Sequence, residues 1–211
     1  MHSDDHLTEF GMVVSHCDYK RILIIACGAL AREILTLIEL NNWKHMALTC
    51  LPAKYHLYPE KITSAVEDAV LKYSNDYDEI FIAYADCGTG GLLANKCKDL
   101  GVKMIAGPHC YSFFEGNNKF SNLSENEITA FYLTDFLVKQ FDSFVWKPMG
   151  LDKHPELLDM YFGNYTKLVY QAQINDPKLD AKAIEISERM GLPLERRYTG
   201  YGDLETALFK I

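Results

Sequence analysis

The sequence predicts an α/β protein whose mostly parallel sheet is built from strand-helix-strand units and followed by a helical C-terminal half. Short runs that are apolar throughout, such as residues 21–26, alternate with stretches whose apolar residues recur at helical spacing. Continuous apolar runs are typical of strands buried on both faces, and strands that alternate with helices favour a parallel sheet. We expect residues 1–20 to be a tail and residues 21–208 to form a single α/β domain with a helical portion from about residue 124.

The elements of the first half follow from this alternation. We expect strands at residues 21–26, 45–50, 78–85 and 102–106, and helices at residues 29–40, 60–73 and from 88 to about 100. In the first helix Leu30, Ile34 and Leu37 lie on one face, which is the face that would cover the sheet.

Helical signals dominate the second half. Ser124 and Glu127 have the spacing of a capping box, which predicts a helix that runs to about residue 141. Further helices are expected at residues 154–173 and 177–190, and Gly191 would end the last one in a left-handed conformation. A short strand is expected around Trp146.

Composition and charge exclude several classes of protein. The chain has 211 residues, of which 48% are hydrophobic and 24% charged, as in ordinary globular proteins. The net charge of −8 argues against non-specific binding to nucleic acid, which depends on neutralising phosphates. No apolar run reaches the roughly 18–20 residues that span a bilayer, and the polar N-terminus does not resemble a signal peptide. We therefore expect a cytoplasmic protein without a membrane or nucleic-acid partner, whose oligomeric state is open.

Four cysteines fall at similar places in the predicted fold. Cys27, Cys50, Cys87 and Cys110 each follow a predicted strand. The carboxyl ends of parallel strands share one edge of the sheet, where ligands bind. The spacing of 23 residues from Cys27 to Cys50 recurs from Cys87 to Cys110, which suggests that a strand-helix-strand unit is used twice.

This pattern predicts a metal site. Thiolates bind zinc and iron–sulfur clusters, and three protein ligands leave a position for water or substrate. A helix N-terminus also lowers the pKa of a cysteine, so Cys27 and Cys87 could be reactive thiols instead. The structural alternative is that the cysteines only fill space in the core, which is what we expect of Cys97; Cys17 belongs to the tail.

Neighbouring residues could complete the site. We expect His109 and Asp86 to act as catalytic groups, since they adjoin Cys110 and Cys87. Glycines beside the cysteines would let the backbone approach a cofactor closely, and these are Gly28, Gly88, Gly90 and Gly91. His56 follows Cys50 near the same edge, but a surface position is the simpler prediction for it.

Several segments carry a resemblance to a known family. They are residues 26–28, the segment 51–60 with its Leu-Pro-Ala start, Asp-Cys-Gly-Thr-Gly-Gly at 86–91, Gly-Pro-His-Cys-Tyr at 107–111, 131–135 and 199–202. Together they resemble a family of proteins of unknown function, number sixteen-thirty-eight, which is common in anaerobic archaea and bacteria. The resemblance spans roughly residues 21–208. It implies an association with corrinoid-dependent methyl transfer and no particular reaction.

Three functions fit these residues. The first is a zinc or iron–sulfur enzyme that acts on a small molecule, for example in methyl or one-carbon transfer with a corrinoid protein or methyltransferase as partner. The second is an accessory protein that binds a metal, cluster or corrinoid without turnover. The third is a metal-free enzyme in which Cys87 or Cys110 is the nucleophile and His109 the base.

Overall fold

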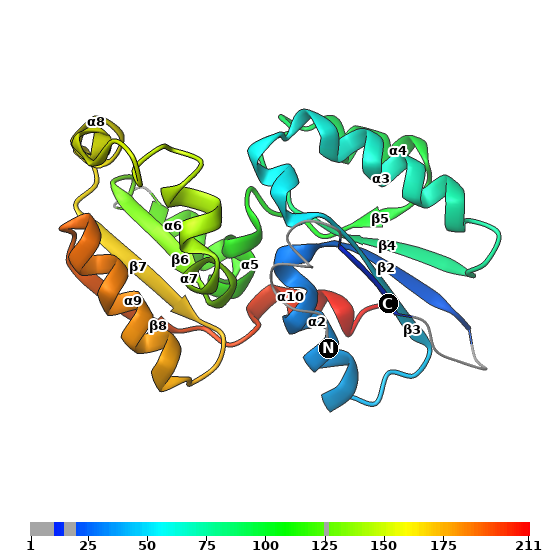
Figure 1. Cartoon of the computed structure of the whole chain (residues 1–211). Helices are drawn as coiled ribbons and strands as arrows, with labels where there is room; N and C mark the ends of the chain where they lie inside the picture. Colours follow the sequence, from blue (N-terminus) through cyan, green and yellow to red (C-terminus); the bar gives the residue numbers. More distant parts are fainter. Residues whose placement is uncertain (1–10, 15–19, 125–126) are drawn as a thin grey trace. The chain divides into compact units, whose positions relative to one another are not determined.

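The computed structural model describes residues 11–14, 20–124 and 127–211, and the chain divides into two compact units (Figure 1). Unit 1 comprises Met1–Phe113 and Asp203–Ile211, and unit 2 comprises Phe114–Gly202. The single α/β domain that the sequence predicts over residues 21–208 stays a prediction. The chain is α/β with parallel sheets, as predicted, and its second half holds a sheet of its own in addition to helices.

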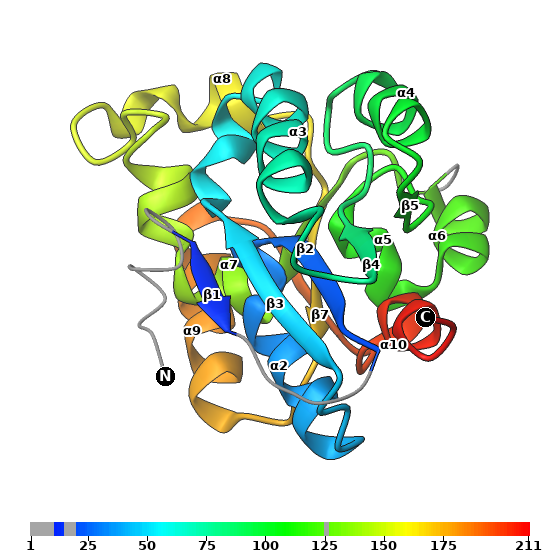
Figure 2. The same cartoon turned by 90° about the vertical axis from the view of Figure 1, so that its right-hand side faces the viewer.

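Unit 1 is built around a five-stranded sheet with the order β1-β3-β2-β4-β5. The strands are β1 (Met12–Val14), β2 (Ile22–Cys27), β3 (Met46–Leu51), β4 (Glu79–Ala83) and β5 (Lys103–Met104). Figure 2 shows β1, β3, β2 and β4 side by side. Strands β2 to β5 pair in parallel, and β1 adds an antiparallel edge from a segment predicted to be tail. Every residue of β2 is buried, as its unbroken apolar run requires.

The connections of unit 1 are helical. They are η1 (Gly28–Leu30), α2 (Ala31–Leu40), η2 (Ala53–Leu57), α3 (Glu60–Tyr73), α4 (Leu92–Asp99), α5 (Cys110–Glu115), which runs into unit 2, and α10 (Gly202–Leu208) near the C-terminus. Helices α3 and α4 lie on one side of the sheet and α2 on the other (Figure 1). The buried faces of α2 and α3 carry the apolar residues that the helical spacing predicts.

The strand order of unit 1 reverses at one point. Strand β2 pairs with β3 on one side and with β4 on the other, so the connections that leave β2 and β3 run in opposite directions across the sheet. In open parallel sheets the crevice outside the carboxyl ends at such a switch point is where ligands bind. Here those ends are Cys27 of β2 and the segment that follows β4.

Unit 2 has a three-stranded parallel sheet of order β6-β7-β8. Its elements are α6 (Asn117–Ser124), β6 (Ala130–Thr134), α7 (Asp135–Lys139), the π-helical turn η3 (Asp142–Trp146), η4 (Pro155–Leu157), α8 (Leu158–Phe162), β7 (Lys167–Ala172), α9 (Pro177–Met190) and β8 (Leu194–Tyr198). One apolar core joins the strands to the helices, with Leu133 and Tyr170 on the sheet and Ala183 and Ile186 on α9.

Three predictions for unit 2 are wrong. Residues 130–134 form β6 and not the middle of a helix, and residues 167–172 form β7 and not a helix end. Both segments carry aromatic and β-branched residues that suit a strand, and pairing with one another satisfies their backbones. The region around Trp146 is a helical turn and not a strand. The expected capping box includes residues 125–126, which lie outside the described residues.

The last helix of unit 2 confirms its prediction. Helix α9 spans Pro177–Met190, with Asp176 capping its start and Gly191 following its end at a φ of 65°.

Within the part of the chain that the structure describes, no helix is both long and apolar enough to cross a membrane.

Candidate metal centre

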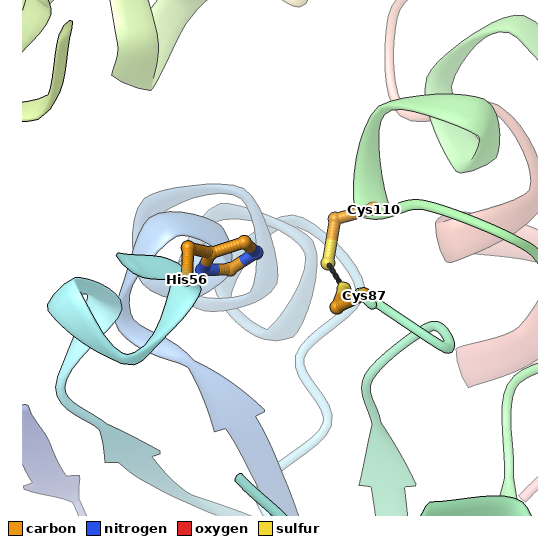
Figure 3. Close-up of side chains that lie close together, drawn as sticks. All are labelled: His56, Cys87 and Cys110. Carbon is orange, nitrogen blue, oxygen red and sulfur yellow. Dashed lines mark hydrogen bonds between the residues drawn. The ribbon is translucent and has the colours of Figure 1, made fainter. Parts of the chain in front are cut away.

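Three side chains of unit 1 form a possible metal site at the carboxyl edge of the sheet (Figure 3). One ligand atom each from His56, Cys87 and Cys110 lies within 4.8 Å of the others. His56 belongs to η2 after β3, Cys87 to the turn after β4, and Cys110 to the first residue of α5 after β5. The parallel topology therefore brings residues from three connections to one place.

The turn that carries Cys87 is held by Asp86. Its carboxylate accepts hydrogen bonds from the backbone N–H groups of Gly90 (3.1 Å) and Gly91 (2.6 Å) and from the hydroxyl of Thr89 (2.9 Å). These bonds, led by that of Gly91, lower the pKa of Asp86 despite its partial burial. The turn needs this support because Cys87 itself has a φ of 47°, which L residues rarely adopt.

The same turn is tied to the segment that carries Cys110. The N–H of Asp86 donates to the carbonyl of Gly107 (3.0 Å), and the N–H of Cys87 donates to that of Pro108 (3.1 Å). These two bonds fix the register between the segments on either side of the site. They place the Sγ atoms of Cys87 and Cys110 at 3.1 Å from each other. Neither cysteine is in a disulfide bond.

The two sulfur atoms are chemically different. The hydrogen bond from Cys110 lowers the pKa of Cys87 to about 4, against its burial, and His56 adds to the effect. The same hydrogen bond, together with burial, raises the pKa of Cys110 well above its ordinary value. Of the two sulfurs, that of Cys87 is therefore the one favoured as a thiolate, and each residue is only 8% exposed.

His56 is oriented by contacts on its Nδ1 side. Nδ1 lies 3.1 Å from the carbonyl of Ala53 and 3.5 Å from Sγ of Cys27. Figure 3 shows a ring nitrogen directed toward Cys87 and Cys110. A histidine that ligates metal typically donates its other N–H to a backbone carbonyl, and this is the arrangement at Ala53. Burial lowers the pKa of His56, but Cys27 and Cys87 outweigh it and raise the pKa well above 6.5.

Cys27 lies beside the group of three. It is fully buried, and its sulfur accepts a hydrogen bond from the N–H of Ala29 (3.3 Å) while it contacts Nδ1 of His56. It is not one of the three residues whose ligand atoms are all mutually close. This geometry suits a residue that positions His56, whereas the sequence analysis expected a metal ligand.

The other expected site residues lie in varied places. Cys50 is buried within β3, opposite Ala26 of β2, and burial first, then Cys27 and Glu33, raises its pKa. His109 stacks on Tyr111 with ring centroids 4.9 Å apart, and its carbonyl accepts hydrogen bonds from Ser112 at the start of α5. Neither is in the group of three. The expected catalytic roles of His109 and Asp86 stay predictions.

The glycines have local structural roles. Gly28 begins η1 and is buried. Gly88, Gly90 and Gly91 all have positive φ values, and the N–H groups of the last two bind Asp86. Those two amides therefore already hold an anion of the chain itself, and a cofactor-binding role for these glycines remains a prediction. Cys97 is buried in α4, as expected of a core residue. Cys17 lies outside the described residues.

The repeated cysteine spacing does not mark equivalent positions. Cys50 lies inside β3, but Cys110 lies beyond β5 and begins a helix. The residue of the β3 connection that reaches the site is His56. A surface position is the simpler prediction for His56, and the signal for its role is its position just after the carboxyl end of a predicted strand.

The family of this chain is shown by a match to a known family profile. The profile of the family described as protein of unknown function (DUF1638) matches residues 50–208. The chain belongs to this family. The matched span includes His56, Cys87 and Cys110 and leaves out Cys27. No curated protein and no solved structure gives a significant match.

Proposed function

We propose that this DUF1638 protein is a zinc enzyme that binds a small thiol at a His56–Cys87–Cys110 centre and activates it for methyl transfer. The observation that carries the proposal is the mutual approach of one imidazole and two cysteine sulfurs at the switch point of the sheet. The association of the family with corrinoid-dependent methyl transfer suggests the methyl donor.

The donor set favours zinc over a cluster. Iron–sulfur clusters are held mostly by four cysteines, whereas two sulfurs and one imidazole nitrogen are common zinc ligands. Structural zinc sites use four protein ligands, and catalytic sites use three and keep one position open. Two thiolates bound to one zinc ion lie about 3.8 Å apart in tetrahedral geometry. The present separation of 3.1 Å needs to open only slightly for such a fit.

The chain prepares these ligands for metal. Cys87 is favoured as a thiolate and the Ala53 carbonyl orients His56, and zinc would displace the protons that the raised pKa values favour on Cys110 and His56. Two thiolates would offset the charge of zinc, and an anionic fourth ligand would bring the net charge of the centre to −1. Zinc supplies Lewis acidity that keeps a bound thiol deprotonated. The thiolate sulfur would then form a bond to the methyl carbon while the donor keeps the electron pair of the broken bond, and the thiol proton goes to solvent.

The proposal is tested by metal analysis of protein purified without oxygen. We expect about one zinc per chain in the wild type, and its loss in Cys87→Ala, Cys110→Ala and His56→Ala. Cys97→Ala is the matched control, because it removes another buried cysteine from the same unit and should leave zinc bound. Iron with acid-labile sulfide in place of zinc would show that the protein binds a cluster. Zinc retained in all three variants would show that these residues are not its ligands.

The same protein with cobalt(II) in place of zinc tests the substrate. Added 2-mercaptoethanol should increase the thiolate-to-cobalt absorption of the wild type if its sulfur enters the coordination sphere. An unchanged spectrum would contradict a thiol substrate.

A second function is favoured by the close sulfur pair. With a thiolate at Cys87 and a thiol at 3.1 Å, the metal-free protein could act as a cysteine nucleophile, with His56 and not His109 as the neighbouring imidazole. Activity that survives exhaustive chelation would support this function and contradict the zinc enzyme.

A further inference from the structure

A fully buried tyrosine lies at the same edge of the sheet as the metal centre. Tyr84 follows β4 directly and is 0% exposed. Its hydroxyl has no hydrogen-bond partner among the residues that the structure describes. Buried tyrosine hydroxyls usually find a partner, since an unsatisfied polar group in a protein interior is costly. A phenylalanine would fill the same space without that cost.

The backbone places Tyr84 beside the site. The parallel pairing of β2 with β4 ends at Ala26 and Ala83, and continuing this register past the end of β4 brings Tyr84 level with Cys27. Side chains at paired positions of neighbouring strands lie on the same face of a sheet. Although Cys87 and burial raise the pKa of Cys110 more strongly, the backbone of Ala85, on the other side of Tyr84, lowers it. Tyr84 therefore lies beside Cys27, whose sulfur contacts His56.

The charges around Tyr84 are those of the site. Burial raises the pKa of Tyr84, and the electrostatic effect of the neighbouring cysteines, Cys27 first, raises it further. The phenol thus stays protonated and can only gain by donating its hydrogen bond to an acceptor. Cys87 and Cys110 offer ligand atoms to a metal ion, and the ligand that completes the metal's coordination would bring a hydrogen-bond acceptor for the phenol.

We infer that the Tyr84 hydroxyl donates a hydrogen bond to the ligand bound at the His56–Cys87–Cys110 centre, and that this ligand presents an anionic acceptor such as a thiolate. The inference rests on the proposed function and deepens it. Tyr84 would then favour anionic ligands over neutral ligands that lack an acceptor, although Tyr84 is not itself a metal ligand.

The test compares wild type, Tyr84→Phe and the control Tyr73→Phe, which removes a hydroxyl from α3 in the same unit. Each protein is loaded with cobalt(II) and titrated with 2-mercaptoethanol and, separately, with acetate. We expect equal cobalt content and equal starting spectra. Tyr84→Phe should bind the thiol about 10-fold or more weakly than the wild type, since hydrogen bonds to charged groups are strong. Tyr73→Phe should match the wild type.

Thermal unfolding of the metal-free proteins gives an independent readout. Removing a hydroxyl that has no partner within the fold should leave the midpoint of Tyr84→Phe equal to or above that of the wild type. A clearly lower midpoint would show that the hydroxyl is bonded within the fold, and it would overturn the inference.

The titrations separate the two proposals. Equal thiol affinity in wild type and Tyr84→Phe overturns the inference and leaves the proposed function standing. If the wild type binds acetate but no thiol, the thiol substrate is refuted, and weaker acetate binding by Tyr84→Phe still supports the role of Tyr84. If the wild-type cobalt protein binds neither probe, both proposals fail.

Discussion

The turn after β4 should lose stability and metal affinity together when its carboxylate is removed. In Asp86→Ala the N–H groups of Gly90 and Gly91 and the hydroxyl of Thr89 lose their shared acceptor. Loss of a capping carboxylate costs about 0.5–2 kcal/mol, and because Asp86 is partly exposed, water would replace some of the bonds. We expect a loss of about 1–2 kcal/mol, which lowers the unfolding midpoint by about 2–8 °C.

The metal affinity should fall as well. Cys87 keeps its positive φ only while the turn is closed, so an open turn would move one of the three candidate ligands. Residues that orient metal ligands typically contribute about 10–100-fold to affinity, and we expect a loss in this range. Competition with a chromophoric chelator measures it. The control is Asp76→Ala, which removes an exposed carboxylate at the end of α3.

The pH dependence gives a further check. The pKa of Asp86 is lowered in the fold, so its contribution to stability is complete above the ordinary value of 3.8 and disappears as the pH falls through the lowered pKa. The difference in midpoint between wild type and Asp86→Ala should therefore be largest near pH 7 and shrink below about pH 4. Equal midpoints and equal zinc affinities at pH 7 would refute this account of the turn.

Four further predictions follow from the described contacts. Cys27→Ala should weaken zinc binding about 10-fold without abolishing it, as chelator competition would show, because it positions His56 and is not in the group of three. In the metal-free protein at pH 6, iodoacetamide should modify Cys87 before the other described cysteines, and zinc should protect it, which peptide mass spectrometry would detect. Glu127→Gln should destabilise unit 2 by about 1–3 kcal/mol at neutral pH, because Arg197 first and then Lys167 lower the pKa of Glu127 to about 2; chemical denaturation should show this difference lost as the pH falls from 4.5 to 2. Leu133→Ala removes a fully buried side chain from the core of unit 2 and should cost about 2–5 kcal/mol in the same assay.

The fold of unit 1 could be predicted because its signals are local. The apolar run of β2 and the helical spacing in α3 lie within single segments, and each predicts one element. The strands of unit 2 could not be predicted in this way. Residues 130–134 and 167–172 carry apolar residues that also fit a helix, and only their pairing with each other makes them strands. That pairing joins segments far apart in the chain, which no single-segment pattern contains.

The sequence predicts the edge of the sheet at which the candidate site lies and two of its three residues. Cys87 and Cys110 follow strands whose carboxyl ends must meet, so their proximity follows from parallel topology. The third member is His56 and not Cys27 or Cys50, because η2 follows β3 at this edge and the Ala53 carbonyl contacts Nδ1 of the imidazole. Such side-chain orientation depends on loop geometry, which residue spacing does not encode.

Zinc-edge X-ray absorption of the anaerobically purified wild type tests the central claim most directly. The proposed zinc centre predicts two sulfur ligands at about 2.3 Å and at least one nitrogen ligand at about 2.0–2.1 Å. Zinc that remains bound to the Cys110→Ser variant should have one sulfur ligand fewer. A shell of four sulfurs, a shell of nitrogen and oxygen alone, or a spectrum of iron in place of zinc would contradict it.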